Sequence, residues 1–99
     1  MIYKTLDEAL DLVSDQKNVI LTFSADWCAP CRALTPVLEE IQREGVAKVA
    51  KVNVDVEDKE RLSQYGIRSI PTSIMFRDGE IVNRAIGIQT KTKLLQMLS

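Results

Sequence analysis

The two cysteines of the chain, Cys28 and Cys31, stand three residues apart in the run Trp27-Cys28-Ala29-Pro30-Cys31. Two thiols at this spacing can close on each other. A β-branched stretch of strand length precedes the run and apolar residues at helical spacing follow it, which places Cys28 at a helix start. Free backbone N–H groups and the helix dipole favour a thiolate there, so we expect Cys28 to be the nucleophile and Cys31 the resolving thiol. Pro30 suits the first helical turn.

A Cys-X-X-Cys pair has other uses, which its spacing alone leaves open. It can supply half of a zinc site, or it can form a purely structural disulfide. The chain has no third cysteine and no histidine, so a tetrahedral zinc site would need carboxylates or a second subunit. A disulfide between residues three apart removes little entropy from the unfolded chain. We therefore favour a redox role and expect no metal.

Composition and charge narrow the range of partners. The 99 residues, 45% of them hydrophobic, are enough for one domain spanning 1–99 with a single core. With 13 basic and 14 acidic residues and no long block of either sign, we expect neither nucleic acid nor a membrane surface as partner. The N-terminus lacks the apolar core of a signal peptide. We expect a cytoplasmic monomer whose resting form is the dithiol.

Strand and helix patterns alternate along the chain. We expect strands at 2–4, 18–24, 48–55, 70–76 and 81–86, and helices from 6 to about 15, at 28–44, from 57 to about 65 and after residue 90. Thr5 and Glu8 have the spacing of a capping box, and Thr90 is a good N-cap for the last helix. Asp55 is expected to cap the third helix.

The connections between these elements indicate the fold class. Helix-length crossovers imply parallel neighbours early in the chain, whereas Asp78-Gly79 predicts an antiparallel hairpin late in it. The result is an α/β fold, a central mixed β-sheet with helices on both faces. Lys51 falls inside the third strand, where it is either a solvated strand residue or a half-buried lysine near the cysteines. In the second case it would be a charge partner for a thiolate or a proton carrier.

Four segments together resemble the thioredoxin family, over essentially the whole chain and in the right order. They are Ala25-Asp26-Trp27-Cys28-Ala29-Pro30-Cys31-Arg32 with Pro36 behind it, Ala50-Lys51-Val52-Asn53-Val54-Asp55, Tyr65-Gly66-Ile67-Arg68-Ser69-Ile70-Pro71-Thr72, and Asp78-Gly79-Glu80 followed by Gly87. The resemblance implies the thioredoxin fold and a general protein dithiol–disulfide oxidoreductase that forms a mixed disulfide with its substrate and needs no cofactor. It also implies a thioredoxin reductase-type electron donor.

The resemblance further implies which residues meet the substrate. A segment of a disulfide-containing protein would lie against the apolar and backbone surface around Cys28, formed by Trp27, Ala29, Pro30, Ile70, Pro71 and Gly87. In the family, the proline that matches Pro71 follows a cis peptide bond and faces the disulfide.

The sequence departs from the family pattern at three positions. Ala29 replaces the usual glycine between the cysteines, and Ser24 stands where many members have an aromatic residue. Thr22 stands where the family usually has a buried aspartate behind the second cysteine, although the companion Lys51 is present. Loss of the buried acid leaves a second possibility open, a binding module or a subunit of a larger complex in which redox activity is incidental.

Overall fold

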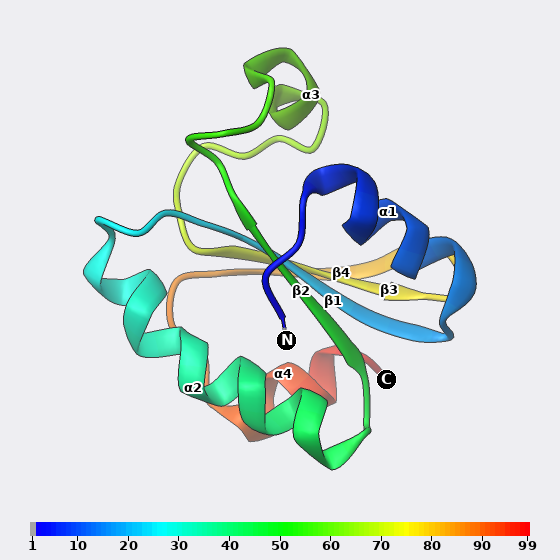
Figure 1. Cartoon of the computed structure of the whole chain (residues 1–99). Coiled ribbons are helices and arrows are strands. Elements are labelled where there is room, and N and C mark those ends of the chain that lie inside the picture. The colour runs from blue at the N-terminus through cyan, green and yellow to red at the C-terminus, as the bar shows by residue number, and fades with distance from the viewer. Residues whose placement is uncertain (1) are drawn as a thin grey trace.

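The computed structural model describes residues 2–99, which form a four-stranded sheet with helices on both faces (Figure 1). The elements are α1 (Leu6–Asp15), β1 (Asn18–Ser24), α2 (Ala29–Glu44), β2 (Lys48–Asn53), α3 (Lys59–Ser63), β3 (Thr72–Arg77), β4 (Glu80–Ile86) and α4 (Lys91–Met97). The strand order is β2-β1-β3-β4. β1 is parallel to β2 and antiparallel to β3, and β3 is antiparallel to β4, so the predicted mixed sheet is confirmed.

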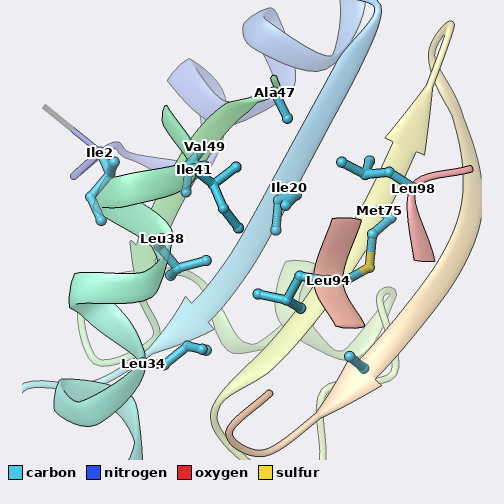
Figure 2. Packing of buried hydrophobic residues seen from close by; sticks show 11 residues of the cluster. Ile2, Ile20, Leu34, Leu38, Ile41, Ala47, Val49, Met75, Leu94 and Leu98 are labelled. Atoms are coloured by element: carbon cyan, nitrogen blue, oxygen red, sulfur yellow. The ribbon is translucent and has the colours of Figure 1, made fainter. Parts of the chain in front are cut away.

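Side chains of the central strand β1 alternate between two cores. Val19, Leu21 and Phe23 pack under α1 and α3, whereas Ile20 faces α2 and α4. Figure 2 shows Leu38 and Ile41 of α2 pointing toward the sheet on that second side. Because both faces of β1 are covered, the strand is apolar at nearly every position. Burial fixes its register, since a slip by one residue would exchange the two faces.

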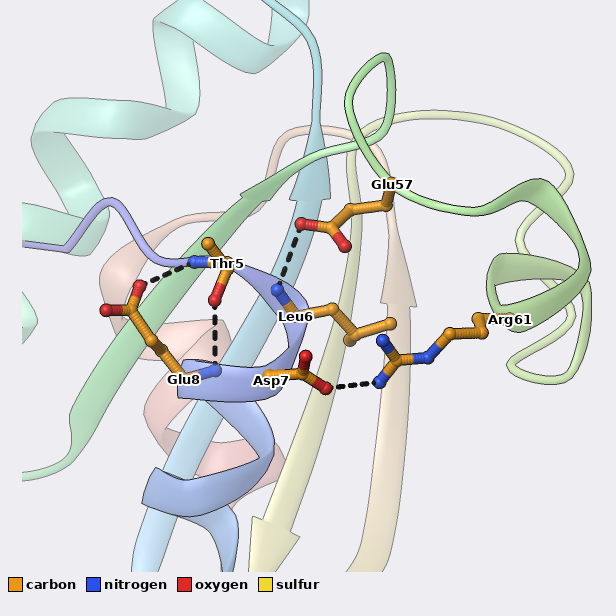
Figure 3. Close-up of polar contacts among 6 residues, drawn as sticks. All are labelled: Thr5, Leu6, Asp7, Glu8, Glu57 and Arg61. Carbon is orange, nitrogen blue, oxygen red and sulfur yellow. Dashed lines mark hydrogen bonds and ion pairs between the residues drawn. The ribbon is translucent and has the colours of Figure 1, made fainter.

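The start of α1 is fixed by the predicted capping box (Figure 3). The Thr5 hydroxyl accepts the Glu8 N–H at 3.1 Å, and Glu8 Oε1 accepts the Thr5 N–H at 2.9 Å. The Thr5 backbone N–H lowers the pKa of the Glu8 carboxyl, because it stabilises the charged form. A longer-range contact joins this turn to the segment before α3: Glu57 Oε2 accepts the N–H of Leu6 at 3.0 Å.

Four sequence predictions about element boundaries are wrong. The strand expected at 48–55 ends at Asn53. The helix expected from residue 57 begins at Lys59, and its N-cap is Asp58 rather than Asp55, because Asp58 Oδ1 accepts the Glu60 N–H at 2.8 Å. The strand expected at 70–76 begins at Thr72, since the proline at 71 has no N–H to donate to a ladder. Residues 2–4 form a single bridge instead of a strand.

That bridge covers the outer edge of β2. The Lys51 N–H donates to the Ile2 carbonyl at 2.7 Å, and the Lys4 N–H donates to the Lys51 carbonyl at 3.1 Å. At the other edge, β3 and β4 are joined by Asp78 and Gly79, both at positive φ (54° and 83°), as a tight hairpin turn with a primed geometry requires. Within residues 2–99, no helix is long and apolar enough to cross a membrane.

Candidate active site

Cys28 occupies the N-cap position of α2, at the end of the loop that follows β1. Its Sγ accepts the backbone N–H of Cys31 at 3.2 Å, and Pro30 lies in the first turn of the helix. The two cysteines form a disulfide, with Cα atoms 5.2 Å apart. The predicted position of Cys28 at a helix start is therefore confirmed. A hydrogen bond from a backbone N–H, together with the helix dipole, stabilises negative charge on the Cys28 sulfur when the pair is reduced.

The two sulfur-bearing residues differ in their access to solvent. Cys28 keeps 6% of its surface exposed and Cys31 keeps 1%. They pack with Ala25 against the half-buried side chains of Val54 and Ile70. A second protein can therefore approach Cys28 more readily than Cys31.

The loop before β3 faces Cys28. Its Ile70–Pro71 peptide bond is cis, as the resemblance predicts. The Ile70 carbonyl oxygen lies 3.8 Å from Cys28 Sγ. Gly87, at φ +82°, donates its N–H to the Pro71 carbonyl at 2.8 Å. The structure therefore places Ile70 beside Cys28 and joins Gly87 to the same loop through Pro71, although Cys28, this loop and Gly87 are far apart in sequence.

Trp27 lies on the surface beside the cysteines, with 68% of its area exposed. Its indole N–H donates to Asp55 Oδ2 at 2.9 Å, which ties the ring to the loop after β2. Asp55 thus holds Trp27 rather than capping a helix, a role that the sequence analysis missed. Ala29 and Pro30 are also exposed, so the surface around Cys28 is apolar and open.

Beneath the first turns of α2, polar side chains replace the apolar core. Lys51, 8% exposed, donates from Nζ to Thr35 Oγ1 at 2.7 Å, and the Thr35 hydroxyl donates to the Cys31 carbonyl at 3.1 Å. The Lys51 ammonium also lies 4.8 Å from the centre of the Tyr3 ring, within cation–π distance. Lys51 therefore lies two hydrogen bonds from the backbone of Cys31. No ion pair joins Lys51 to a carboxylate anywhere in the described chain.

Thr22 lies next to Lys51 in the register of the parallel pair, but its hydroxyl turns the other way. It shares a hydrogen bond of 2.8 Å with the Ser73 hydroxyl of β3, and both residues are buried. The two neutral hydroxyls satisfy each other's hydrogen-bonding needs at little cost in free energy. A single carboxylate in the same buried place would lose its hydration.

Comparison with known proteins identifies the family. The thioredoxin family model matches residues 3–99. A thioredoxin from Rickettsia conorii is 46% identical over 91 residues, covering 90% of this chain and 86% of that protein. Thioredoxin 1 from a Nostoc species is 50% identical over 90 residues, covering 89% and 83% of the two chains. The chain belongs to the thioredoxin family.

A solved structure agrees with this assignment. A mutant thioredoxin from Halobacterium salinarum superimposes with a TM-score of 0.88 at 39% identity, and the match covers 98% of this chain and 86% of that one. The chain has the thioredoxin fold, and its Cys28–Cys31 pair makes it a thiol–disulfide oxidoreductase. Its partners, as for thioredoxins generally, are disulfide-containing substrates and a reductase that supplies electrons. Residues 2–99 contain no cluster of three side chains suited to hold a metal ion.

Two of the three departures from the usual thioredoxin pattern, Thr22 and Ser24, are buried in β1, whereas Ala29 is exposed. Ser24 replaces the common aromatic residue, and its buried hydroxyl has no hydrogen-bond partner among the described residues. A cavity of about 20 Å³ lies beside it, bounded also by Tyr3, Lys51 and Asn53. This space holds about one water molecule, which would satisfy the Ser24 hydroxyl.

Proposed function

We propose that the protein reduces disulfides in other proteins, with Cys28 as the attacking thiol and Cys31 as the resolving thiol. The Cys28 thiolate attacks one substrate sulfur, so the substrate S–S bond breaks, a mixed disulfide forms and the other substrate sulfur leaves as a thiolate that takes up a proton. Cys31, once deprotonated, attacks the Cys28 sulfur and releases the second substrate thiolate. Two electrons pass from the dithiol to the substrate, and the Cys28–Cys31 disulfide remains.

The observation that carries this assignment is the position of Cys28. Its sulfur accepts a backbone N–H at the start of α2, and Cys28 is the more exposed of the two cysteine residues. Both properties favour a nucleophilic thiolate that a partner can reach. Cys31 lies inside the first turn and is reached only from Cys28.

We also propose where the substrate lies. The segment that carries its disulfide would follow the open apolar surface of Trp27, Ala29 and Pro30, and pass the loop of Ile70 and Pro71. The 3.8 Å distance from the Ile70 carbonyl to Cys28 Sγ supports this path, because a substrate sulfur joined to Cys28 would lie next to that backbone. Gly87 borders the same loop and has no side chain to obstruct the segment.

Lys51 has a supporting role in the second step. Its ammonium donates to Thr35 Oγ1 and lies against the Tyr3 ring. Lys51 therefore acts as a positive charge that favours the Cys31 thiolate, while water takes the Cys31 proton because Thr22 cannot hold one. Stopped-flow decay of the mixed disulfide tests this role: Lys51→Met should slow the decay and shift its pH profile upward. An unchanged pH profile would show that Lys51 only packs there.

The principal experiment separates this function from a binding module with incidental redox activity. The protein should accelerate reduction of insulin by dithiothreitol, and Cys28→Ser should abolish the acceleration. Cys31→Ser should trap covalent complexes with substrate proteins through Cys28, whereas Cys28→Ser should trap few. Equal trapping by the two variants would contradict the assigned roles, and no acceleration at all would favour the binding module.

The cellular setting completes the proposal. The cycle needs the dithiol as its resting form, which the reducing cytoplasm maintains. The protein would work there as a monomer, and a thioredoxin reductase-type donor would recharge it. Measuring the redox potential is the direct check, because 30 mV corresponds to about 1.4 kcal/mol for this two-electron couple. A potential near those of disulfide-forming oxidants would contradict the direction proposed here.

A further inference from the structure

A groove of about 390 Å³ opens beside the active site, between Trp27 and α3. Apolar side chains form part of its lining, among them Leu62, Ile67 and Ile70. Because Trp27 and Ile70 also border Cys28, the groove continues the surface on which a substrate segment would lie. A peptide that reaches Cys28 from this side must therefore pass through it.

Of the charged side chains that line the groove, one has a bonding partner and two form no ion pair among the described residues. Asp55 accepts the Trp27 indole N–H, so this carboxylate already has a partner. Lys59 and Arg68 line the same groove and are exposed, and neither forms an ion pair within the part of the chain that the structure describes. The groove is thus lined by two cationic side chains without an ion pair in the described chain, Lys59 and Arg68, and by one carboxylate, Asp55, that is hydrogen-bonded to Trp27.

No acidic residue near α3 forms an ion pair with Lys59 or Arg68 within residues 2–99. Asp58 caps the first turn of α3, and Glu57 accepts the N–H of Leu6. Asp7 pairs with Arg61 at 2.8 Å, away from the groove lining. Among the residues that line the groove, two cations and one carboxylate therefore leave one positive charge in excess, although the whole chain has a net charge of −1.

We propose that this groove selects substrates by charge: it binds a segment that flanks the target cysteine with an apolar side chain followed by Asp or Glu. This inference rests on the proposed function, since the segment belongs to a protein whose disulfide is reduced. The apolar side chain would lie against Leu62 and Ile67, and the carboxylates would approach Lys59 and Arg68.

Three peptides that differ only in charge test the proposal. Each has one cysteine joined by a disulfide to the chromophore 2-nitro-5-thiobenzoate, flanked by Leu and then by Glu-Glu, Gln-Gln or Lys-Lys. Attack by Cys28 on the peptide sulfur releases the coloured thiolate. At low salt we expect the Glu peptide to react about tenfold faster than the Lys peptide, since each exposed ion pair gives a modest gain, and we expect the ratio to shrink at 0.5 M NaCl.

Two double variants locate the effect. Lys59→Glu with Arg68→Glu should abolish or reverse the preference for the Glu peptide. The matched control, Lys17→Glu with Lys93→Glu, changes the net charge equally at exposed positions outside the groove and should keep the preference. Any of three results would overturn the proposal. The wild-type protein reduces all peptides at equal rates, the Lys59→Glu/Arg68→Glu variant keeps the preference for the Glu peptide, or the control variant loses it. If no peptide reacts, the proposed function itself fails.

Discussion

Thr35→Val is the substitution that most directly tests the polar contacts behind Cys31. The Thr35 hydroxyl accepts a hydrogen bond from the Lys51 ammonium at 2.7 Å and donates one to the Cys31 carbonyl at 3.1 Å. Valine has nearly the same shape and a similar helix propensity, so the change removes both hydrogen bonds and little else. It leaves the ammonium of Lys51, a residue that is 8% exposed, beside the Tyr3 ring and without its Thr35 acceptor.

The expected cost follows from these contacts. A hydrogen bond to a charged group contributes about 1.5–3 kcal/mol, and losing it leaves Lys51 unsatisfied in a buried place. The second bond matters less, because the carbonyl of Cys31 lies within a helix and has a backbone partner there. We expect the free energy of unfolding to fall by about 2 kcal/mol, which for a domain of this size lowers Tm by about 10 °C.

Urea denaturation of the reduced protein measures this loss, with Thr35→Ser as the matched control. Serine keeps the hydroxyl, so it should recover more than half of the lost stability. In a Lys51→Met background, Thr35→Val should cost under about 0.5 kcal/mol, because no ammonium is left without its acceptor. A wild-type stability for Thr35→Val, or the same loss in the Lys51→Met background, would refute the reasoning.

Three further substitutions test other parts of the structure. Thr22→Asp should lower the free energy of unfolding by about 2 kcal/mol at pH 7 and speed the decay of the mixed disulfide. Burial raises the pKa of the new carboxyl, so this loss of stability should grow as the pH rises above about 4. Thr5→Ala should cost about 1 kcal/mol in urea denaturation, because it removes the cap of α1. The Lys91 ammonium hydrogen-bonds the Glu40 carboxyl and lowers its pKa below the usual 4.5, so this pair stabilises the folded protein above that pH and stops doing so as the pH falls. In Lys91→Gln, the free energy of unfolding should therefore depend less steeply on pH in the acidic range, most clearly at low salt.

Local patterns were enough to predict most elements of the fold. The capping box at Thr5, the hairpin at Asp78 and Gly79, and the helix that starts after Cys28 each depend on residues within a few positions of one another. Such signals act before any tertiary contact forms, so sequence reasoning finds them. The boundary of α3 was mistaken because two acidic residues, Asp55 and Asp58, both had the chemistry of a cap.

The partners of the site residues were not predictable in the same way. That Lys51 would meet Thr35 depends on how α2 crosses β2, and that Thr22 would turn to Ser73 depends on strand register. Thr35 did have a local signal, since it lies four residues after Cys31, where a helical hydroxyl can reach the carbonyl. The contact of Asp55 with Trp27 joins two loops and has no sequence pattern at all.

The first residues of the chain have a consequence for how the protein should be handled. Ile2 and Lys4 satisfy the backbone of Lys51 at the margin of the sheet, and Tyr3 shields its ammonium. Trimming by a protease, or a rigid fusion that pulls this segment away, would leave the unpaired backbone groups of β2 as a template for another chain. Protein altered in this way would tend to form dimers or aggregates, and at the same time it would lose the contact between Tyr3 and Lys51. Tags and labels therefore belong at the C-terminal end, after α4, where no strand is uncovered.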